Sequence, residues 1–254
     1  MIKFISLQKH NFKRSIGQLI LTSQNENRTN QMNFEEKRKR LVTKLIDRKA
    51  LTSSRVIDAM IKVERHQFVP EGALSSAYID SPLSIGSNQT ISAPHMNAMM
   101  CEYLELEEGD KVLEVGTGSG YHAALCAELV APTNSKNPGH IFSIERHLEL
   151  VESARNSLKI TGYHNRVTVI HGDGTLGHPS EAPYDKILVT ASSPKKIPPP
   201  LKDQLRMGGI LCIPAGAKDW AQDLYILRKK SNEFEVEKKT GVRFVPLIGK
   251  YGFD

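Results

Sequence analysis

The sequence has few cysteines and no long apolar run. Cys101, Cys126 and Cys212 are odd in number, widely spaced and without a C-x-x-C pair, so neither a disulfide framework nor a zinc site is expected. Each lies among apolar neighbours, which predicts buried thiols in a reducing, cytoplasmic compartment. No stretch approaches the roughly 18–20 apolar residues that cross a membrane. With 39% apolar and 24% charged residues, the composition is globular, which excludes disorder over the whole chain.

Acidic residues are scarce at the N-terminus. Residues 1–31 hold five Lys or Arg and one acid, Glu26, and residues 22–31 are polar enough to predict disorder. No apolar core of secretory-signal length is present. We therefore predict a basic leader over residues 1–32, followed by one folded domain over residues 33–254. A transit peptide, or a working start codon at Met32, would each explain such a leader.

The net charge of +6 suggests a nucleic-acid partner, but the charge is unevenly distributed. The leader carries +4, and residues 34–49, a predicted helix, carry seven basic and three acidic residues, another +4. Residues 50–254 therefore carry −2. The run Lys37–Arg40 could be a localisation signal or a phosphate-binding patch, although a solvated helix face is the commoner explanation. No nucleic-acid partner is expected for the larger part of the chain.

Strand-like and helix-like segments alternate between residues 109 and 216. This alternation predicts an α/β fold with a doubly wound, mostly parallel sheet of the Rossmann-like kind. Three strand-like segments in residues 217–254 predict an antiparallel C-terminal edge. The predicted strands are Lys111–Val115, His140–Ile144, Val167–His171, Lys186–Thr190, Gly209–Pro214, Asp223–Arg228, Glu233–Lys238 and Val242–Leu247, and the predicted helices are Tyr121–Val130, Leu148–Ile160 and Leu201–Leu205.

A glycine-rich turn follows the first of these strands. Gly116, Gly118 and Gly120 stand at every second position and open a helix, which lets the backbone approach a ligand closely. The dinucleotide fingerprint G-x-G-x-x-G would need a third glycine where Tyr121 stands. Glu114, just before the turn, would repel a pyrophosphate but suits the ammonium group of an amino-acid-bearing cofactor.

Acids also end the next two strands. Glu145 is placed to accept both ribose hydroxyls of an adenosine, and Asp173, followed by Gly174, could accept from an adenine amine. An amino-acid head, a ribose and an adenine together describe S-adenosylmethionine. Glu145 or Asp173 alone would be an ordinary surface acid, but three acids at successive strand ends are harder to obtain by chance. The predicted cofactor-binding residues are Glu114, Gly116, Gly118, Gly120, Glu145, Asp173 and Gly174.

A distinctive segment, Thr90–Met96, lies upstream of the turn. Ser92 before Ala93-Pro94 has the pattern of a helix N-cap with Pro in the first turn, which would explain Ser92 without any chemistry. His95 could position a substrate or could be a structural residue of the first helical turn. The residues alone leave these alternatives open.

The chain closely resembles the protein-L-isoaspartate (D-aspartate) O-methyltransferases, which are class I S-adenosylmethionine-dependent methyltransferases. The Thr90–Met96 block is that family's signature, and the resemblance runs from about Asn33 to Phe253. The other matching segments are Phe68–Pro70, Ala77–Gly86, Val112–Tyr121, Ile144–Arg146, His171–Gly174, Tyr184–Ala191, Gly208–Gly216 and Val242–Leu247.

The resemblance implies methyl transfer from S-adenosylmethionine to the α-carboxyl of L-isoaspartyl and D-aspartyl residues, which starts repair through a succinimide. It implies that Ser92 is the catalytic residue, and that Thr90, His95, Val242, Phe244 and Val245 bind the substrate. We expect Ser92 to orient the carboxylate and not to act as a nucleophile. Two departures from the family pattern are the leader and a longer turn over Ala131–Gly139.

The expected partners are damaged polypeptides, preferably in flexible segments, and the expected state is a monomer without a membrane or nucleic-acid partner. We assign residues 33–108 to N-terminal helices and the substrate motif, residues 109–216 to the cofactor-binding core, and residues 217–254 to C-terminal strands. One rival hypothesis is a related methyltransferase acting on RNA or a small molecule, which would leave the Gln89–Met96 block unexplained. Another is a non-catalytic module that binds the cofactor or damaged protein.

Overall fold

The structure is a computed structural model that describes residues 33–218, 221–231 and 233–254. The predicted leader lies outside the described residues. The chain divides into two units, residues 1–40 and 41–254. The helix predicted from residue 34 covers residues 33–47. All the geometry that follows belongs to the second unit.

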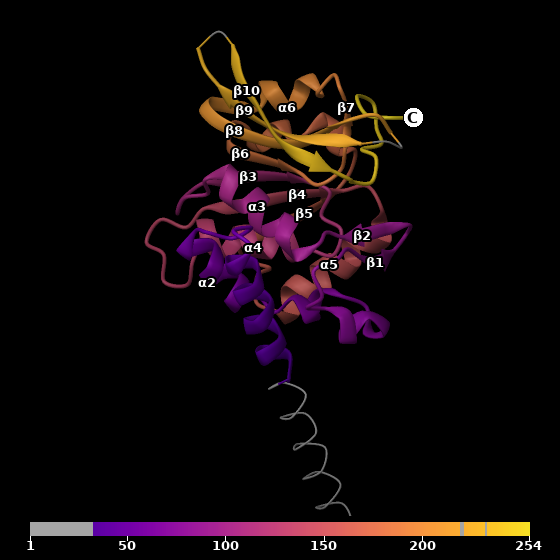
Figure 1. The fold of residues 1–254 in the computed structure, drawn as a ribbon. Coiled ribbons are helices and arrows are strands. Elements are labelled where there is room, and N and C mark those ends of the chain that lie inside the picture. Colours follow the sequence, from indigo (N-terminus) through magenta and orange to yellow (C-terminus); the bar gives the residue numbers. More distant parts are fainter. Residues whose placement is uncertain (1–32, 219–220, 232) are drawn as a thin grey trace, which may run out of the picture. The chain divides into compact units, whose positions relative to one another are not determined.

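The second unit is built on one twisted sheet with a mostly parallel order (Figure 1). Its strands run in the spatial order β10-β9-β8-β6-β3-β4-β5, and the short β7 pairs with β8. All neighbours from β8 to β5 are parallel, whereas β9 and β10 are antiparallel. The strands are β3 (Lys111–Val115), β4 (His140–Glu145), β5 (Val167–His171), β6 (Tyr184–Val189), β7 (Ser193–Pro194), β8 (Leu205–Gly216), β9 (Gln222–Lys229) and β10 (Phe234–Val242).

Helices connect the parallel strands and bury the two faces of the sheet. One apolar core joins one face of the sheet to the helices α2 (Ser54–Lys62), α3 (Pro94–Leu104), α4 (Tyr121–Val130) and α5 (Leu148–Ile160). A second core joins the other face to the short helix α6 (Pro199–Asp203). Every residue of α4 is buried, and seven of its ten residues are Ala, Leu, Cys or Val, as expected for a helix enclosed on all sides.

The fold class is confirmed, because the alternating segments form a doubly wound parallel sheet with an antiparallel C-terminal edge. Four predicted elements, at residues 111–115, 121–130, 148–160 and 167–171, have the bounds that the structure gives them. The strand expected at Val242–Leu247 is wrong: β10 ends at Val242, and residues 243–247 belong to no strand and contain a single isolated bridge, between Pro246 and Ser192. Pro246 lacks the N–H that a continuing ladder needs.

The segment before the glycine turn has a structure of its own. Two 3₁₀ helices, η1 (Arg65–Phe68) and η2 (Glu71–Ser76), lead into a small antiparallel hairpin of β1 (Leu83–Gly86) and β2 (Gln89–Ile91). In Figure 1 this hairpin lies near α5, to the side of the large sheet. The hairpin delivers the Thr90–Met96 block to the first turn of α3.

The large sheet ends on one side at β10, whose outer edge pairs with no other strand in the described part of the chain. Four of its nine residues are charged, at positions 235, 237, 238 and 239. Among the described residues, no helix is long and apolar enough to span a bilayer.

Candidate active site

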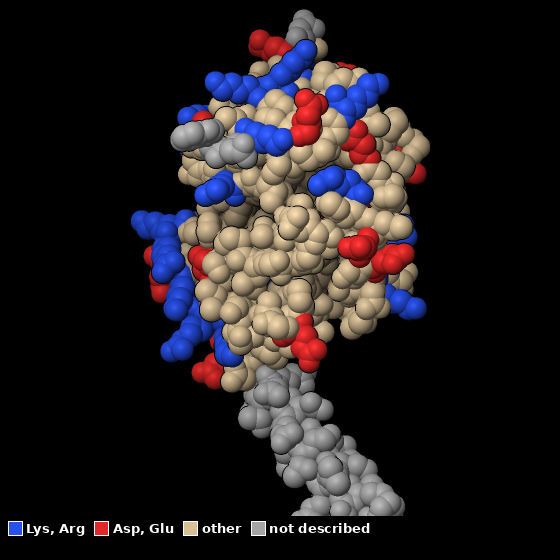
Figure 2. Space-filling view, turned by 90° about the vertical axis from the view of Figure 1, so that its right-hand side faces the viewer, with Lys and Arg blue, Asp and Glu red and all other residues tan. Residues whose placement is uncertain are grey.

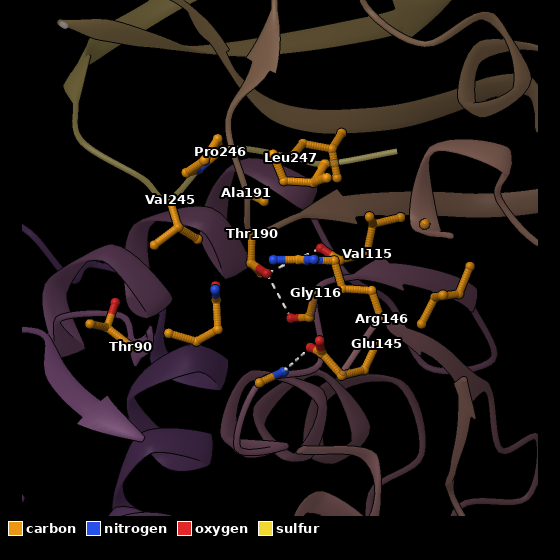
Figure 3. Close-up of a pocket in the computed structure, with 15 residues that line it drawn as sticks. Thr90, Val115, Gly116, Glu145, Arg146, Thr190, Ala191, Val245, Pro246 and Leu247 are labelled. Atoms are coloured by element: carbon orange, nitrogen blue, oxygen red, sulfur yellow. Dashed lines mark hydrogen bonds between the residues drawn. The ribbon is translucent and has the colours of Figure 1, made fainter. Parts of the chain in front are cut away.

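The glycine turn lies where the order of the parallel strands reverses. The chain passes from β3 outward to β4 and β5, and then returns to β6 on the other side of β3. In open α/β sheets such a switch point leaves a crevice at the carboxyl ends of the strands, where ligands bind. A cavity is found there, lined by Val115, Gly116, Gly118, Glu145, Gly174 and Thr190 (Figure 3).

The backbone of the turn requires glycine at its first position. Gly116 has a φ of +98°, and a Cβ there would lie 2.3 Å from Oγ1 of Thr190. That hydroxyl donates to the Gly116 carbonyl at 2.7 Å. The close approach therefore leaves a wall of backbone, without side chains, facing the cavity.

Glu145 of β4 holds the turn from the opposite side. Its Oε2 accepts from the Gly118 N–H at 3.0 Å, as Figure 3 shows, and its Oε1 accepts from the His147 N–H at 3.0 Å. Each carboxylate oxygen has two lone pairs, so each can still accept from a bound hydroxyl. The predicted ribose-binding acid thus lies in the cavity with acceptor capacity to spare.

Glu114 is beneath the turn and does not line the cavity. It is fully buried, and its Oε2 accepts from the Ser143 hydroxyl, which is also bonded to Thr117 Oγ1 at 2.6 Å. Its Oε1 has no hydrogen-bond partner, and burial raises the pKa of Glu114 to about 7. A buried carboxylate oxygen without a donor is costly, and a cationic group near it would lower that cost.

The other two predicted cofactor residues outside the cavity are held by packing. Gly120 is the N-cap of α4, and a Cβ on it would lie 3.3 Å from Cγ of Leu158. Asp173 accepts at Oδ1 from the N–H and hydroxyl of Thr175, at 2.8 and 2.7 Å, and at Oδ2 from the Lys250 N–H at 2.8 Å. Although burial raises it, these hydrogen bonds lower the pKa of Asp173 overall. One lone pair on Oδ2 remains for a ligand.

A second cavity adjoins the first. Its lining includes the predicted catalytic and substrate-binding residues, namely Thr90, Ser92, His95, Val242, Phe244 and Val245. The two cavities share Thr90, Thr190, Val245 and Pro246. Figure 3 shows Thr90 and Val245 on one side of the first cavity and Glu145 across it. The two groups of predicted residues, which are far apart in the sequence, therefore meet along a common wall.

Ser92 does not cap α3, contrary to the structural alternative for this residue. The N-cap is Ala93, and no side chain of that residue or of Ser92 bonds to the helix start. Asp80 takes the place of a capping side chain, because its Oδ1 accepts from the His95 N–H in the first turn at 3.0 Å. Within the described chain we find no hydrogen-bond partner for the Ser92 hydroxyl, which lies in the second cavity.

His95 has a structural contact and also lines the second cavity, so its geometry is compatible with both of the alternatives for this residue. Its Nδ1 lies 2.8 Å from Oδ1 of Asp80, so the ring is fixed by the same carboxylate that caps the helix. The side chain is 39% exposed and lines the second cavity. Asp80 thereby positions the imidazole with Nε2 available to a ligand.

Arg65 supports the Ser92 segment from below. It is fully buried, donates from Nε to the Ala77 carbonyl and from a terminal nitrogen to the Ser92 carbonyl, both at 2.9 Å, and lies over the Tyr121 ring at 4.9 Å. Burial lowers the pKa of its guanidinium from the ordinary value. One cation therefore ties η1 and the substrate segment to the start of α4.

The segment after β10 is fixed by side chains instead of a sheet ladder. Gln222, which is 1% exposed, accepts from the Phe244 N–H at 2.7 Å and donates to the Phe244 carbonyl at 3.3 Å. The Ser192 N–H donates to the Val245 carbonyl, and the Leu247 N–H donates to Ser192, both at 2.8 Å. Residues 242–247 therefore line the cavities from an irregular but anchored backbone.

Sequence reasoning missed Thr190, Arg65 and Gln222. Thr190 follows β6, beside β3 in the sheet, so its position at the strand end was a usable signal. Arg65 and Gln222 act through contacts with residues 27 and 22 positions away, and no local pattern marks them.

These features define a cofactor-dependent transferase of the α/β class, with a nucleotide-type crevice joined to a second substrate cavity. The family model for protein-L-isoaspartate(D-aspartate) O-methyltransferase matches residues 36–252. The chain belongs to this family. It is 56% identical over 201 residues, 79% of the chain and 91% of the relative, to a protein-L-isoaspartate O-methyltransferase from Methanothrix thermoacetophila. A relative from Hyperthermus butylicus is 51% identical, covering 87% of this chain and 92% of its own.

Two solved structures have the same fold. A protein-L-isoaspartate O-methyltransferase superposes with a TM-score of 0.75 at 28% identity, over 85% of this chain and 67% of its own. A Plasmodium falciparum structure assigned to the same enzymes, in complex with S-adenosyl-L-homocysteine, gives 0.74 at 29% identity over 83% and 98%. The predicted family, enzyme class and cofactor are confirmed.

Proposed function

We propose that Ser92 and the walls of the second cavity present an isoaspartyl carboxylate to the cofactor crevice, so that this chain methylates damaged polypeptides and starts their repair. One observation carries the proposal: Ser92, whose hydroxyl has no hydrogen-bond partner among the described residues, lines the second cavity, and this cavity shares a wall with the crevice. S-adenosylmethionine, when bound, supplies a methyl group activated by a sulfonium.

The chemistry places modest demands on the protein. A carboxylate with an ordinary pKa of about 4 is ionised at neutral pH, so no general base is needed. The residues have to orient the carboxylate and exclude water. The Ser92 hydroxyl donates to one carboxylate oxygen, and His95, fixed through Nδ1 by Asp80, lies beside it.

The cofactor-side residues fit an adenosyl amino acid. Gly116 and Gly118 give close backbone approach, Glu145 offers acceptors to a ribose, and Gly174 lines the same cavity. Glu114 contributes a negative partial charge below the turn toward the amino-acid end. Asp173 offers its remaining lone pair to an adenine amine, and Gly120 lets α4 start close to α5.

The substrate is proposed to be an extended, flexible segment, bound largely through its backbone. The backbone N–H and carbonyl of Phe244 form hydrogen bonds with the Gln222 side chain, whereas Val242 and Val245 are apolar residues of the cavity lining. Figure 2 shows the face on which β1, β2 and the C-terminal end lie, and uncharged residues form its middle, with charged ones around them. A largely uncharged surface suits segments of many sequences.

We also propose the division of labour that the sequence suggests. Residues 33–108 supply the substrate motif, residues 109–216 the cofactor crevice, and residues 217–254 the second wall of the substrate cavity. The lining of the two cavities supports this division. The enzyme is proposed to work as a monomer in the cytoplasm, with residues 1–32 outside its catalytic domain.

The test is methyl transfer from radiolabelled S-adenosylmethionine to an isoaspartyl peptide and to its aspartyl twin. We expect base-labile label in the first peptide only. Ser92→Ala should lower kcat at least about tenfold, the loss of one charge-assisted hydrogen bond, and leave S-adenosylhomocysteine affinity within twofold. Equal labelling of both peptides, or loss of cofactor affinity in Ser92→Ala, would contradict the proposal.

A further inference from the structure

Three side chains that can bind a metal ion meet beneath the active site and take no part in the proposed reaction. Cys101 lies on α3, and His122 and Cys126 lie one turn apart on α4. All three are buried, and one donor atom from each lies within 4.8 Å of the other two. In the described part of the chain no other set of His, Cys, Asp and Glu side chains is grouped in this way.

The spacing of the donor atoms is close to what a bound cation needs. Sγ of Cys101 lies 3.4 Å from Nε2 of His122. Zinc bonds of about 2.3 Å to sulfur and about 2.0 Å to nitrogen, at a tetrahedral angle, place sulfur and nitrogen about 3.5 Å apart. Two thiolates on the same ion lie about 3.8 Å apart by the same geometry. The Cys101–His122 distance thus matches that of two ligands on one ion, and the donor atom of Cys126 lies within 4.8 Å of both.

The imidazole is oriented as metal-binding histidines are. In the amide orientation that satisfies both of its ends, Asn97 accepts from Nδ1 of His122 at 3.1 Å and donates to the Ser92 carbonyl at 3.2 Å. The proton on Nδ1 leaves the Nε2 lone pair facing Cys101. A second partner that fixes the tautomer is the usual outer contact of a metal-binding histidine.

Binding of a metal ion would release the protons of both thiols. A thiolate is the form that binds metals. Two thiolates and a neutral imidazole would neutralise a divalent ion, which suits a buried position.

A separate cavity borders the cluster and is lined by Cys101 and by three acidic residues, Glu102, Glu105 and Glu107, of which Glu105 is paired with Arg228. Its one cation, Arg55, donates to the carbonyls of Leu106 and Leu129 at 2.6 and 2.7 Å. The acidic wall favours entry of cations.

We propose that Cys101, His122 and Cys126 form a binding site for a thiophilic d¹⁰ cation, either Zn²⁺ or Cu⁺, that ties α3 to α4. Cysteine sulfur and imidazole nitrogen are the ligands that these ions share. The site is structural, since none of its three residues lines either reaction cavity. His122 lines a separate small cavity that Gly116 and Ser92 also line. Occupancy would hold the Ser92 segment against the glycine turn. This proposal departs from the sequence-based expectation of no zinc site, and it uses the i, i+4 spacing of His122 and Cys126, which that expectation did not consider.

The test uses the whole chain, stripped with chelator and reductant and then titrated anaerobically with Zn²⁺, Cd²⁺ and Cu⁺ in separate samples. We expect one equivalent of metal per chain after gel filtration, a thiolate-to-cadmium absorption band, and a higher Tm with metal. The preferred ion, Zn²⁺ or Cu⁺, is the one retained when both compete. These readouts do not depend on methyl transfer.

Cys126→Ala and Asn97→Ala test the ligands and their support. Cys126→Ala should abolish the cadmium band, and Asn97→Ala should weaken metal binding about 10–100-fold, the usual effect of losing such a support. Cys212→Ala is the matched control, because it removes the third buried thiol and should bind metal like the parent. Absence of stoichiometric metal in the parent, equal uptake by Cys126→Ala, or a Cys101–Cys126 disulfide formed in place of metal binding would overturn the proposal.

Discussion

The two sides of the active site are built by different means. The cofactor side consists of strand ends and a glycine turn, held by backbone geometry and by Glu145. The substrate side consists of irregular segments, held by single side chains that reach across the fold, such as Asp80, Arg65 and Gln222. Helices, strands and glycine turns can be recognised from a local sequence pattern, whereas a segment held by one side chain from a distant part of the sequence cannot.

Arg65→Met is expected to have the largest effect and to break the substrate side alone. It leaves the buried Ala77 carbonyl without its side-chain donor and removes one of the two side-chain donors to the Ser92 carbonyl, at a cost of about 2–5 kcal/mol in the free energy of unfolding. Urea denaturation measures it. Arg55→Met, the control, also removes two bonds to carbonyls, but from an exposed residue, and should cost less than half as much. Equal costs would contradict the role of burial.

Glu114→Gln should change how stability depends on pH. Burial raises the pKa of Glu114 to about 7 in the folded protein, above its unfolded value of about 4.3. The folded state therefore binds the proton more tightly, and stability is lost as pH rises from the lower value through the higher one. Relative to Glu114→Gln, the parent should lose about 3 kcal/mol across this window. The free energy of unfolding of both proteins is measured by denaturation at pH 5 and at pH 8. If the difference between the parent and Glu114→Gln is the same at both pH values, this account is refuted.

Gly116→Ala should damage the cofactor side. At a φ of +98°, with Thr190 Oγ1 only 2.3 Å from the new Cβ, the turn must distort at a cost of about 1–3 kcal/mol. We expect a loss of about 5–100-fold in S-adenosylhomocysteine affinity, measured by calorimetry. Gly72→Ala is the control, since nothing lies within 4 Å of its Cβ position and no positive φ is required. An unchanged affinity in Gly116→Ala would show that the turn tolerates a side chain.

Gln222→Met should have the smallest energetic effect of these variants. It should also separate the substrate side from the cofactor side most clearly, because only one of the two KM values is expected to change. Without its bonds to Phe244 the segment after β10 loosens, and the KM for an isoaspartyl peptide should rise about tenfold, equivalent to about 1.4 kcal/mol. The KM for S-adenosylmethionine should stay the same. Gln67→Met, on the surface, should change neither value. A parallel rise in both KM values would mean that the two sides are not independent.

The same contrast explains what could be predicted from the sequence. Periodicity located β3, α4, α5 and β5, and strand ends located Gly116 and Glu145, because these signals are local. The capping alternative for Ser92 is wrong, and the sequence could not exclude it, because Asp80, which accepts from the helix start instead, lies 15 residues from His95. The apolar run after β10 was mistaken for a strand, because Gln222 and Ser192 satisfy its backbone in place of a neighbouring ladder.

The outer edge of β10, which pairs with no strand in the described residues, has a further consequence for a protein that works on damaged chains. An unpaired strand edge is a template on which a partly unfolded chain can add a strand and aggregate. Glu235, Glu237, Lys238 and Lys239 place charges of both signs along this edge, around the exposed Val236. Any polypeptide that docked there would have to desolvate them. The charges on β10 therefore disfavour strand addition and aggregation of an unfolded substrate chain at the edge of the sheet, while the proposed substrate cavity stays open to it.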